Sequence, residues 1–252
     1  GLNLKNFKCP VPIINNHNKT ITDYNGKKLM IVSFLEGKAK QMLTPSDCKQ
    51  VGIEVAKMHE ITKEFKIERN NNLSISSWRK LFHSVKEQCI KIDKDLPKLI
   101  ETNLIDVEKK WPKKLPSGII HADLFSDNIF FHNEKFNGII DFYFSCNDFY
   151  SFEIAICFNA LCFDGQKNNL SFNVTKAKNF INGYSSIRKL LDDERESIKV
   201  LSQGAALRFL LTRVFDALNT VEGAIVKVKD PLEYLKRLEF HKNSKNYEDY
   251  FF

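Results

Sequence analysis

Residues 118–148 read GIIHADLFSDNIFFHNEKFNGIIDFYFSCND, and this stretch decides the fold. It contains two Gly-Ile-Ile runs, each of which leads into a polar cluster. The aromatic run between them predicts a strand, and the Asn- and Gly-containing stretch after it predicts the turn of a hairpin. Such a hairpin returns Asn128 and Asp141 to the same end of a sheet, beside the loop that carries Asp123. We therefore expect two carboxylates and one carboxamide around a single small volume.

This set of side chains suits phosphoryl transfer to an alcohol. Asp123 is expected to orient the attacking hydroxyl and accept its proton, while Asn128 and Asp141 hold magnesium on nucleotide phosphates. Magnesium takes a few hard oxygen ligands and keeps several waters, so one Asp and one Asn suffice. His121 is expected to brace the loop through hydrogen bonds rather than to react. The alternative is an ordinary polar turn before a hairpin, but that does not explain why all these polar residues fall at strand ends.

The pattern H-x-D-x-x-x-x-N at 121–128, followed by an apolar strand and Ile-Ile-Asp, carries a resemblance. It resembles the catalytic and metal-binding segments of the protein-kinase-like small-molecule phosphotransferases, which include aminoglycoside and choline kinases. More narrowly, HADLFSDNIFF, GIIDFYFSCND and GAALRFLLTR at 204–213 resemble bacterial homoserine kinases of this superfamily. The resemblance implies ATP-dependent phosphorylation of the L-homoserine hydroxyl, a step of threonine biosynthesis, with Mg2+ as the metal and ATP as co-substrate.

The same resemblance implies an α+β, protein-kinase-like bilobal fold. Residues 1–37 are expected to be a remnant of the small β lobe with the hinge, where Phe34 and Leu35 lie beside adenine. Residues 38–252 are expected to form the large, mostly helical lobe with the catalytic loop. The numbered chain has no Gly-rich phosphate loop and no strand lysine for the phosphates, which precede this part in the family. We therefore expect a truncated N-terminal small lobe.

The spacing of apolar residues predicts that most of the chain is helical. Thr44 followed by Pro45 and Asp47 is typical of a capped helix start. A longer helix is expected to begin at Asp192. The expected strands are 13–14, 20–22 and 28–34, and the expected helices are 44–61, 77–89, 96–111, 152–162, 173–184, 192–215 and 230–241.

Three charged residues are candidates for binding the substrate. Arg208 falls within the apolar stripe of the long helix. Its guanidinium either reaches solvent past the apolar side chains or forms an ion pair. Alternatively, it binds a substrate carboxylate through two parallel hydrogen bonds. Arg213 is a second candidate for binding that carboxylate. Asp148 precedes an apolar helix, and it either caps this helix or contacts a substrate ammonium.

The composition is that of a soluble globular protein, with 252 residues, 43% hydrophobic and 27% charged. The net charge is +7, but the lysines form no stripe with stacking aromatics, so no nucleic-acid partner is expected. A positive field still attracts a nucleotide polyphosphate. The six cysteines form no C-x-x-C pair, which favours reduced thiols. No signal peptide or bilayer-length apolar run is visible, so we expect a cytoplasmic location without a membrane partner; oligomeric state is not indicated.

Two other functions remain open at this point. One is a kinase of the same fold that acts on choline, ethanolamine, an aminoglycoside or a sugar. Choline calls for an aromatic cage and an aminoglycoside for an acidic pocket, whereas Arg208 with Asp148 suits a zwitterionic amino acid. The other is a non-catalytic nucleotide-binding protein, which is favoured only if the chain truly starts at Gly1.

Overall fold

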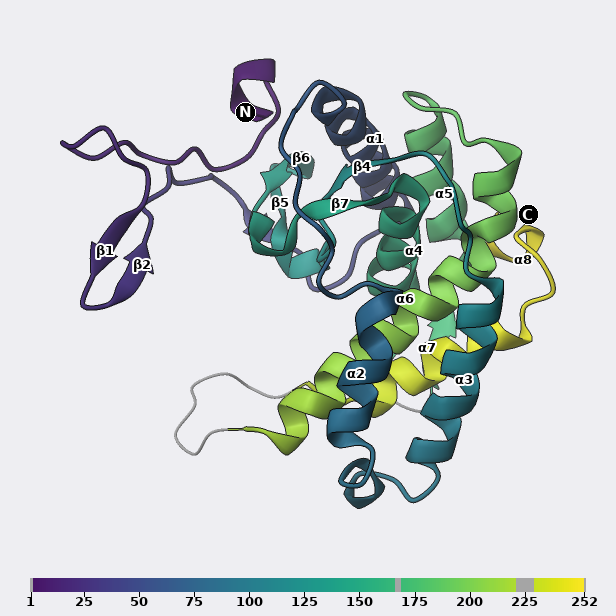
Figure 1. The fold of residues 1–252 in the computed structure, drawn as a ribbon. Helices are drawn as coiled ribbons and strands as arrows, with labels where there is room; N and C mark the ends of the chain where they lie inside the picture. Colours follow the sequence, from purple (N-terminus) through teal and green to yellow (C-terminus); the bar gives the residue numbers. More distant parts are fainter. Residues whose placement is uncertain (1, 166–168, 221–228, 252) are drawn as a thin grey trace.

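The computed structural model describes residues 2–165, 169–220 and 229–251, and most of them are helical (Figure 1). The strands are short and form four small sheets. The helices are α1 (Pro45–Thr62), α2 (Ile75–Val85), α3 (Leu96–Lys110), α4 (Tyr150–Leu161), α5 (Val174–Ser185), α6 (Asp192–Leu218), α7 (Leu232–Asn243) and α8 (Glu248–Phe251). The strands are β1 (Thr22–Tyr24), β2 (Lys27–Leu29), β3 (Lys38–Ala39), β4 (Ser117–Ile120), β5 (Ile129–His132), β6 (Lys135–Ile139), β7 (Cys146–Phe149), β8 (Phe163–Asp164) and β9 (Ser171–Phe172).

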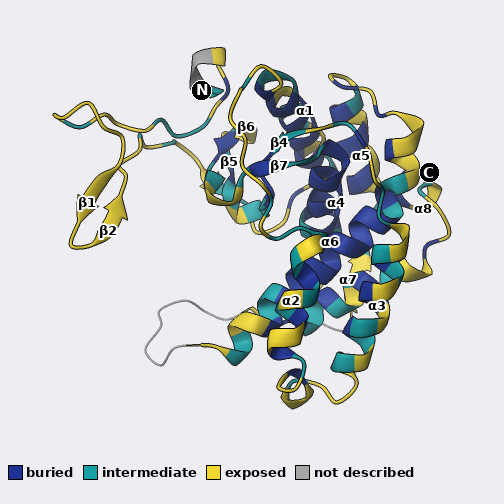
Figure 2. Cartoon of the chain, in the orientation of Figure 1, coloured by how far each residue is buried: buried dark blue, intermediate teal, exposed yellow. Residues whose placement is uncertain are grey.

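Helix α4 lies at the centre of the hydrophobic core. It is mostly apolar. It is also almost completely buried, as Figure 2 shows. Its Phe152 and Ile156 pack in a core cluster with α2, α3, α6 and α7, while Ile154 and Phe158 pack in a second cluster with α1, α5 and α8. The two clusters therefore share one helix. Among the described residues, no helix has the length and hydrophobicity needed to cross a bilayer.

Helices α1 and α5 pack with their backbones almost in contact, because each has a glycine at the crossing point. A Cβ added to Gly52 would lie 2.1 Å from the carbonyl oxygen of Phe180, and one added to Gly183 would lie 2.1 Å from that of Lys49. Both distances are far below a van der Waals contact. No larger residue fits at either position unless the helices move apart.

The predicted catalytic hairpin is confirmed as β5 and β6. The two strands pair antiparallel with Ile129 opposite Ile139, and β3 adds a third strand on the other side of β5. The turn is tighter than the sequence suggested, since it consists of Asn133 and Glu134, both with positive φ (48° and 60°). Two positive φ values in a two-residue loop suit the right-handed twist of a hairpin.

Residues 10–34 project from the body as an exposed arm that carries the β1–β2 hairpin (Figures 1 and 2). The prediction of a continuous strand over 28–34 is wrong, because β2 ends at Leu29. Beyond it only an isolated bridge joins Val32 to Pro12, flanked by the bond from Ile13 N–H to Ile31 O (2.9 Å). Proline cannot donate a ladder hydrogen bond, so the pairing does not extend into a sheet.

The helix starts were predicted with mixed success. The capping box of Thr44 and Asp47 is confirmed at α1, and α6 begins at Asp192 as expected. The expected start of the second helix at Ser77 is wrong, because α2 begins at Ile75 with Ser74 as its N-cap residue. Several serines in a row offer equivalent caps, and tertiary packing selects among them.

We predict that Gly52→Ala lowers the free energy of unfolding by about 2 kcal/mol or more, since the added methyl group must push α1 away from α5. Lys178→Ala, at an exposed position of α5, is the control and should change it by less than about 0.5 kcal/mol. Urea unfolding followed by circular dichroism measures both. Equal stability of the Gly52→Ala protein and the wild type would contradict the close helix contact.

Candidate active site

A cavity of about 550 Å³ lies between the catalytic loop and the C-terminal half of α6. Asp123, Asn128 and Asp141 line it from the loop and the hairpin, and Arg208 and Arg213 line it from α6. The structure therefore brings together five side chains that the sequence singled out from segments up to 90 residues apart.

The hairpin and the catalytic loop are joined by hydrogen bonds. The N–H of Ile140 donates to the carbonyl of Asn128 (3.0 Å), so the residues before and after the hairpin stay in register. The side-chain Nδ2 of Asn128 donates to the carbonyl of Asp123 (2.8 Å). No described residue donates to Asn128 Oδ1, so this oxygen is left for a ligand.

Two residues of the site have left-handed backbone conformations. Ala122, directly before Asp123, has φ 65°, and Asp141 has φ 61°. A positive φ is uncommon for non-glycine residues, and it persists only where neighbouring contacts hold it. Both positions lie where a functional carboxylate is presented to the cavity, as is typical of strained sites with a chemical role.

His121 makes hydrogen bonds within the loop, and its role there stays a prediction. Its ring is buried, with Nε2 2.9 Å from the carbonyl oxygen of Ile140, and its Nδ1 accepts from the N–H of Asp123 at 3.3 Å. Burial lowers the pKa of His121 to about 4, so the ring is neutral near pH 7. A neutral ring that accepts at Nδ1 donates at Nε2, which suits both contacts. The ring also packs edge-on against Phe142, with centroids 4.9 Å apart.

The strained peptide at Ala122 is held from both sides by buried side chains of ionisable residues. Glu153 of α4 accepts hydrogen bonds from the N–H groups of His121 and Ala122, the latter at 3.1 Å. Arg208 of α6 donates from Nη1 to the carbonyl of Ala122. The sequence analysis missed Glu153, although a single carboxylate in a helix that is otherwise apolar all round was a usable signal.

The predicted hinge residues lie at a second cavity. Phe34 and Leu35 line a largely apolar cavity of about 1010 Å³ together with Phe130, Ile140 and Asp141. Phe34 is 88% exposed and therefore has room to move. Asp141 lines both cavities, so an apolar site and a polar site meet at this carboxylate.

The remaining substrate candidates have definite partners. Asp148 does not line the first cavity; its carboxylate accepts from Asn71 Nδ2 (2.6 Å) and from the N–H of Phe149 (2.7 Å). Its expected role as a helix cap is wrong, because α4 begins at Tyr150 and the N-cap residue is Phe149. Arg213 lines the cavity, and its Nη1 bonds the side chain of Glu233 at 3.0 Å.

Comparison with known proteins identifies the family. The profile of the phosphotransferase enzyme family matches residues 2–189. The chain belongs to this phosphotransferase family. Among its curated relatives is a homoserine kinase of Mesorhizobium japonicum, 39% identical over 246 residues, which covers 98% of this chain and 76% of the relative. A homoserine kinase of Paramagnetospirillum magneticum is 44% identical over 239 residues, with 92% and 72% covered.

Solved structures confirm the predicted protein-kinase-like fold of this phosphotransferase. An amicoumacin kinase in complex with AMP-PNP and Ca2+ superposes with a TM-score of 0.69 at 12% identity, over 98% of this chain and 75% of that one. A choline kinase of Cryptosporidium parvum superposes with a TM-score of 0.67 at 17% identity, over 96% and 74%. At such identities the similarity shows the fold alone.

The electrostatics of the phosphotransferase cavity centre on Asp123. Burial raises the pKa of its carboxyl, the nearby Arg208 guanidinium lowers it, and Asp141 raises it again, so that the net shift is upward. A carboxylate with a raised pKa is a better proton acceptor than an ordinary Asp. The Arg208 guanidinium opposes this rise, because its positive charge favours the carboxylate form.

The side-chain oxygens of Asn128 and Asp141 suit magnesium. Among the residues described, no group of three or more His, Cys, Asp or Glu side chains is arranged to hold a metal ion. Asn128 and Asp141 instead offer an amide oxygen without a donor and an exposed carboxylate, whose only described contact is with the N–H of Tyr143 at 3.4 Å. Two hard oxygens are enough where phosphates and water complete the coordination.

We predict that Glu153→Gln becomes more stable relative to the wild type as the pH rises. Burial raises the pKa of Glu153 to about 7, so the folded wild type keeps a proton that the unfolded chain loses above pH ~4.5. The wild type therefore loses stability between pH ~4.5 and 7, which amounts to about 2 kcal/mol from pH 5 to 7.5. The glutamine does not titrate and should escape this loss.

Chemical unfolding of both proteins at pH 5, 6, 7 and 7.5 measures this difference. A difference that stays constant over the range would mean that Glu153 carries the same charge in the folded and the unfolded chain.

Proposed function

We propose that this protein is an ATP-dependent homoserine kinase, which transfers the γ-phosphate to the side-chain hydroxyl of L-homoserine. One geometric observation carries the proposal: Asp123, Asn128 and Asp141 converge on a cavity that meets an apolar cavity at Asp141. The curated homoserine kinases, at 39–44% identity across nearly the whole chain, support the acceptor. A phosphotransferase needs this combination of a base, metal ligands and a site for a nucleotide base.

In the proposed mechanism Asp123 orients the hydroxyl and accepts its proton. The hydrogen bond from Asn128 and the contacts of His121 fix the backbone around this carboxylate, so the acceptor is held in one orientation. Magnesium held by Asn128 and Asp141 would neutralise charge on the nucleotide phosphates. Arg208 adds a fixed positive charge at the same end of the cavity.

The apolar cavity is proposed to receive the adenine, with Phe34 and Leu35 at its rim. In this arrangement residues 1–37 belong to the small lobe and hinge, and residues 38–252 form the large lobe. A biosynthetic kinase with these substrates is proposed to work in the cytoplasm.

Choline is the alternative acceptor that a specific observation favours. Four phenylalanines line the first cavity, and aromatic faces attract a quaternary ammonium. However, the same cavity carries two arginines, which a substrate without an anion does not need. Homoserine, with its carboxylate, makes use of both kinds of group.

We predict that Asp123→Asn reduces kcat by about 100-fold or more while ATP binding stays within a few-fold, because Asp123 acts on the acceptor rather than on the nucleotide. Asp106→Asn, on the outer side of α3, is the matched control and should keep full activity. Steady-state kinetics and calorimetric ATP titration measure the two quantities. Normal turnover by the Asp123→Asn protein would rule out its assignment as the base.

We also predict that, among several alcohols, only homoserine is phosphorylated at an appreciable rate. A coupled ADP-release assay with magnesium and ATP would compare homoserine, choline, ethanolamine, an aminoglycoside and a blank without acceptor. Turnover with another alcohol alone would keep the kinase assignment and reject homoserine. ATP binding without turnover on any acceptor would favour a non-catalytic nucleotide-binding protein.

A further inference from the structure

An α-amino acid carries its ammonium and its carboxylate on the same carbon atom. A site that recognises both ends therefore needs an anion and a cation side by side. They must also lie at a distance from the catalytic base that matches the length of the substrate. The charged residues along α6 meet both conditions.

Arg208 lies at the catalytic end of the cavity. It is 2% exposed, it donates to the carbonyl of Ala122, and its charge acts directly on Asp123. Its guanidinium also stacks on the ring of Phe209 at 4.4 Å. These contacts use Arg208 to hold the catalytic loop, which places it beside the reacting hydroxyl rather than at the far end of the substrate.

Asp216 lies at the other end of the same cavity, eight residues beyond Arg208 on α6. That spacing is about 12 Å along the helix axis. An extended homoserine molecule spans roughly 10 Å from base to ammonium partner when a hydrogen bond is added at each end. The length of the substrate is therefore similar to the spacing along α6 between Asp216 and Arg208, whose charge acts on Asp123.

Arg213 and Asp216 are neighbours on one face of α6, three residues apart, and both line the cavity. They are not paired with each other: Arg213 Nη1 bonds Glu233 and the carbonyl of Asp230, and the guanidinium stacks 4.5 Å above the ring of Tyr234. In the described part of the chain, neither Nη2 nor Nε of Arg213 has a partner. The guanidinium of Arg213 is thus held in place, and its Nε and Nη2 groups are free to donate to a ligand.

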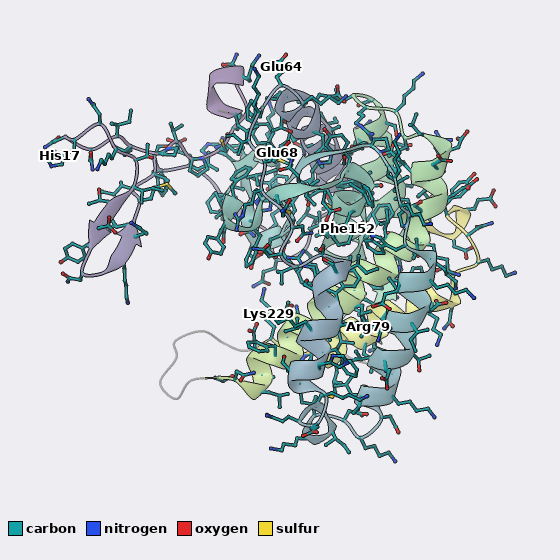
Figure 3. All side chains as sticks on the ribbon, viewed as in Figure 1. His17, Glu64, Glu68, Arg79, Phe152 and Lys229 are labelled. Carbon is teal, nitrogen blue, oxygen red and sulfur yellow. The ribbon has the colours of Figure 1, made fainter. Side chains whose placement is uncertain are left out.

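Within the described residues, the carboxylate of Asp216 makes no hydrogen bond and no ion pair. Asp216 is an exposed residue on the cavity wall; desolvation raises the pKa of its carboxyl, and no cation offsets this rise. Lys229, labelled in Figure 3, lines the same cavity but is directed to Asp127 at 3.6 Å and to the face of Phe125. A carboxylate that faces a cavity without a cation is suited to accept one from a ligand.

We infer that Asp216 and Arg213 form the recognition site for the α-amino acid end of the acceptor, with Asp216 on the ammonium and Arg213 on the carboxylate. The inference rests on the proposed homoserine kinase function. Asp216 then takes the role that the sequence suggested for Asp148, whose two carboxylate oxygens are already occupied outside the cavity. Arg208 acts as a positioning residue for the catalytic loop.

The test uses three acceptors that share the same three carbons from the hydroxyl group to the α-position: L-homoserine, 4-hydroxybutanoate, which lacks the ammonium, and 3-aminopropan-1-ol, which lacks the carboxylate. The wild type should prefer homoserine over each analogue by about tenfold or more in kcat/KM. In Asp216→Asn, the preference over 4-hydroxybutanoate should fall to within a few-fold, while that over 3-aminopropan-1-ol persists. Arg213→Gln should show the reverse pattern.

A merely structural role for Asp216 would lower activity on all three acceptors alike and leave both preferences intact, and that result overturns the inference. Loss of the preference in Asp148→Asn instead of Asp216→Asn also overturns it. Asp193→Asn, at the exposed start of the same helix, is the matched control and should keep both preferences.

The failure of the proposed function has a different signature. A wild-type protein that does not phosphorylate homoserine at all removes that function, and the inference with it. If the wild type phosphorylates homoserine but the Asp216→Asn protein still prefers homoserine over 4-hydroxybutanoate, only the inference about Asp216 and Arg213 fails.

Discussion

The site depends on the hydrogen bonds by which two buried side chains hold one strained peptide. Ala122 has φ 65°, which an alanine adopts only under constraint, and it is the residue that turns the chain so that Asp123 faces the cavity. Glu153 binds its N–H and Arg208 its carbonyl oxygen. Because the two partners come from different helices, the relative position of α4 and α6 determines where the catalytic carboxylate lies.

This arrangement accounts for two of the ionisable side chains that are buried in the core. Glu153 is fully buried, and Arg208 is nearly so, at a cost in solvation that only good hydrogen bonds offset. Each of them bonds backbone groups of the loop, which would otherwise be buried without partners. The polar contacts in the core therefore hold the loop, and the apolar contacts of the same helices hold the rest of the fold.

Much of the site was predictable from the sequence because its signals are local. The hairpin that returns Asn128 and Asp141 to one end could be recognised in a single stretch from its apolar run and the polar residues after it, although the turn proved shorter than expected. The capping box at Thr44 is equally local. The family resemblance added the protein-kinase-like fold, which the structural comparisons confirm.

What the sequence did not reveal depends on partners distant in the chain. The strand expected over 28–34 ends early because its neighbour contains prolines. Asp148 precedes α4 and Asp216 lies within α6, and only the packing of the helices shows which of the two lines the cavity. Glu153 could be recognised as unusual in its helix, but its two backbone partners lie more than thirty residues away.

The position of α4 between the two core clusters affects the local unfolding of the protein. A helix that packs on both sides cannot detach while either half of the core remains intact, so its amide protons exchange only when the whole core unfolds. The anchor of the catalytic loop thus belongs to the most slowly exchanging part of the molecule. The arm at residues 10–34, most of which are exposed, lies at the opposite end of that scale. The chain thus combines a rigid catalytic loop, anchored on α4, with a loosely held arm beside the apolar cavity.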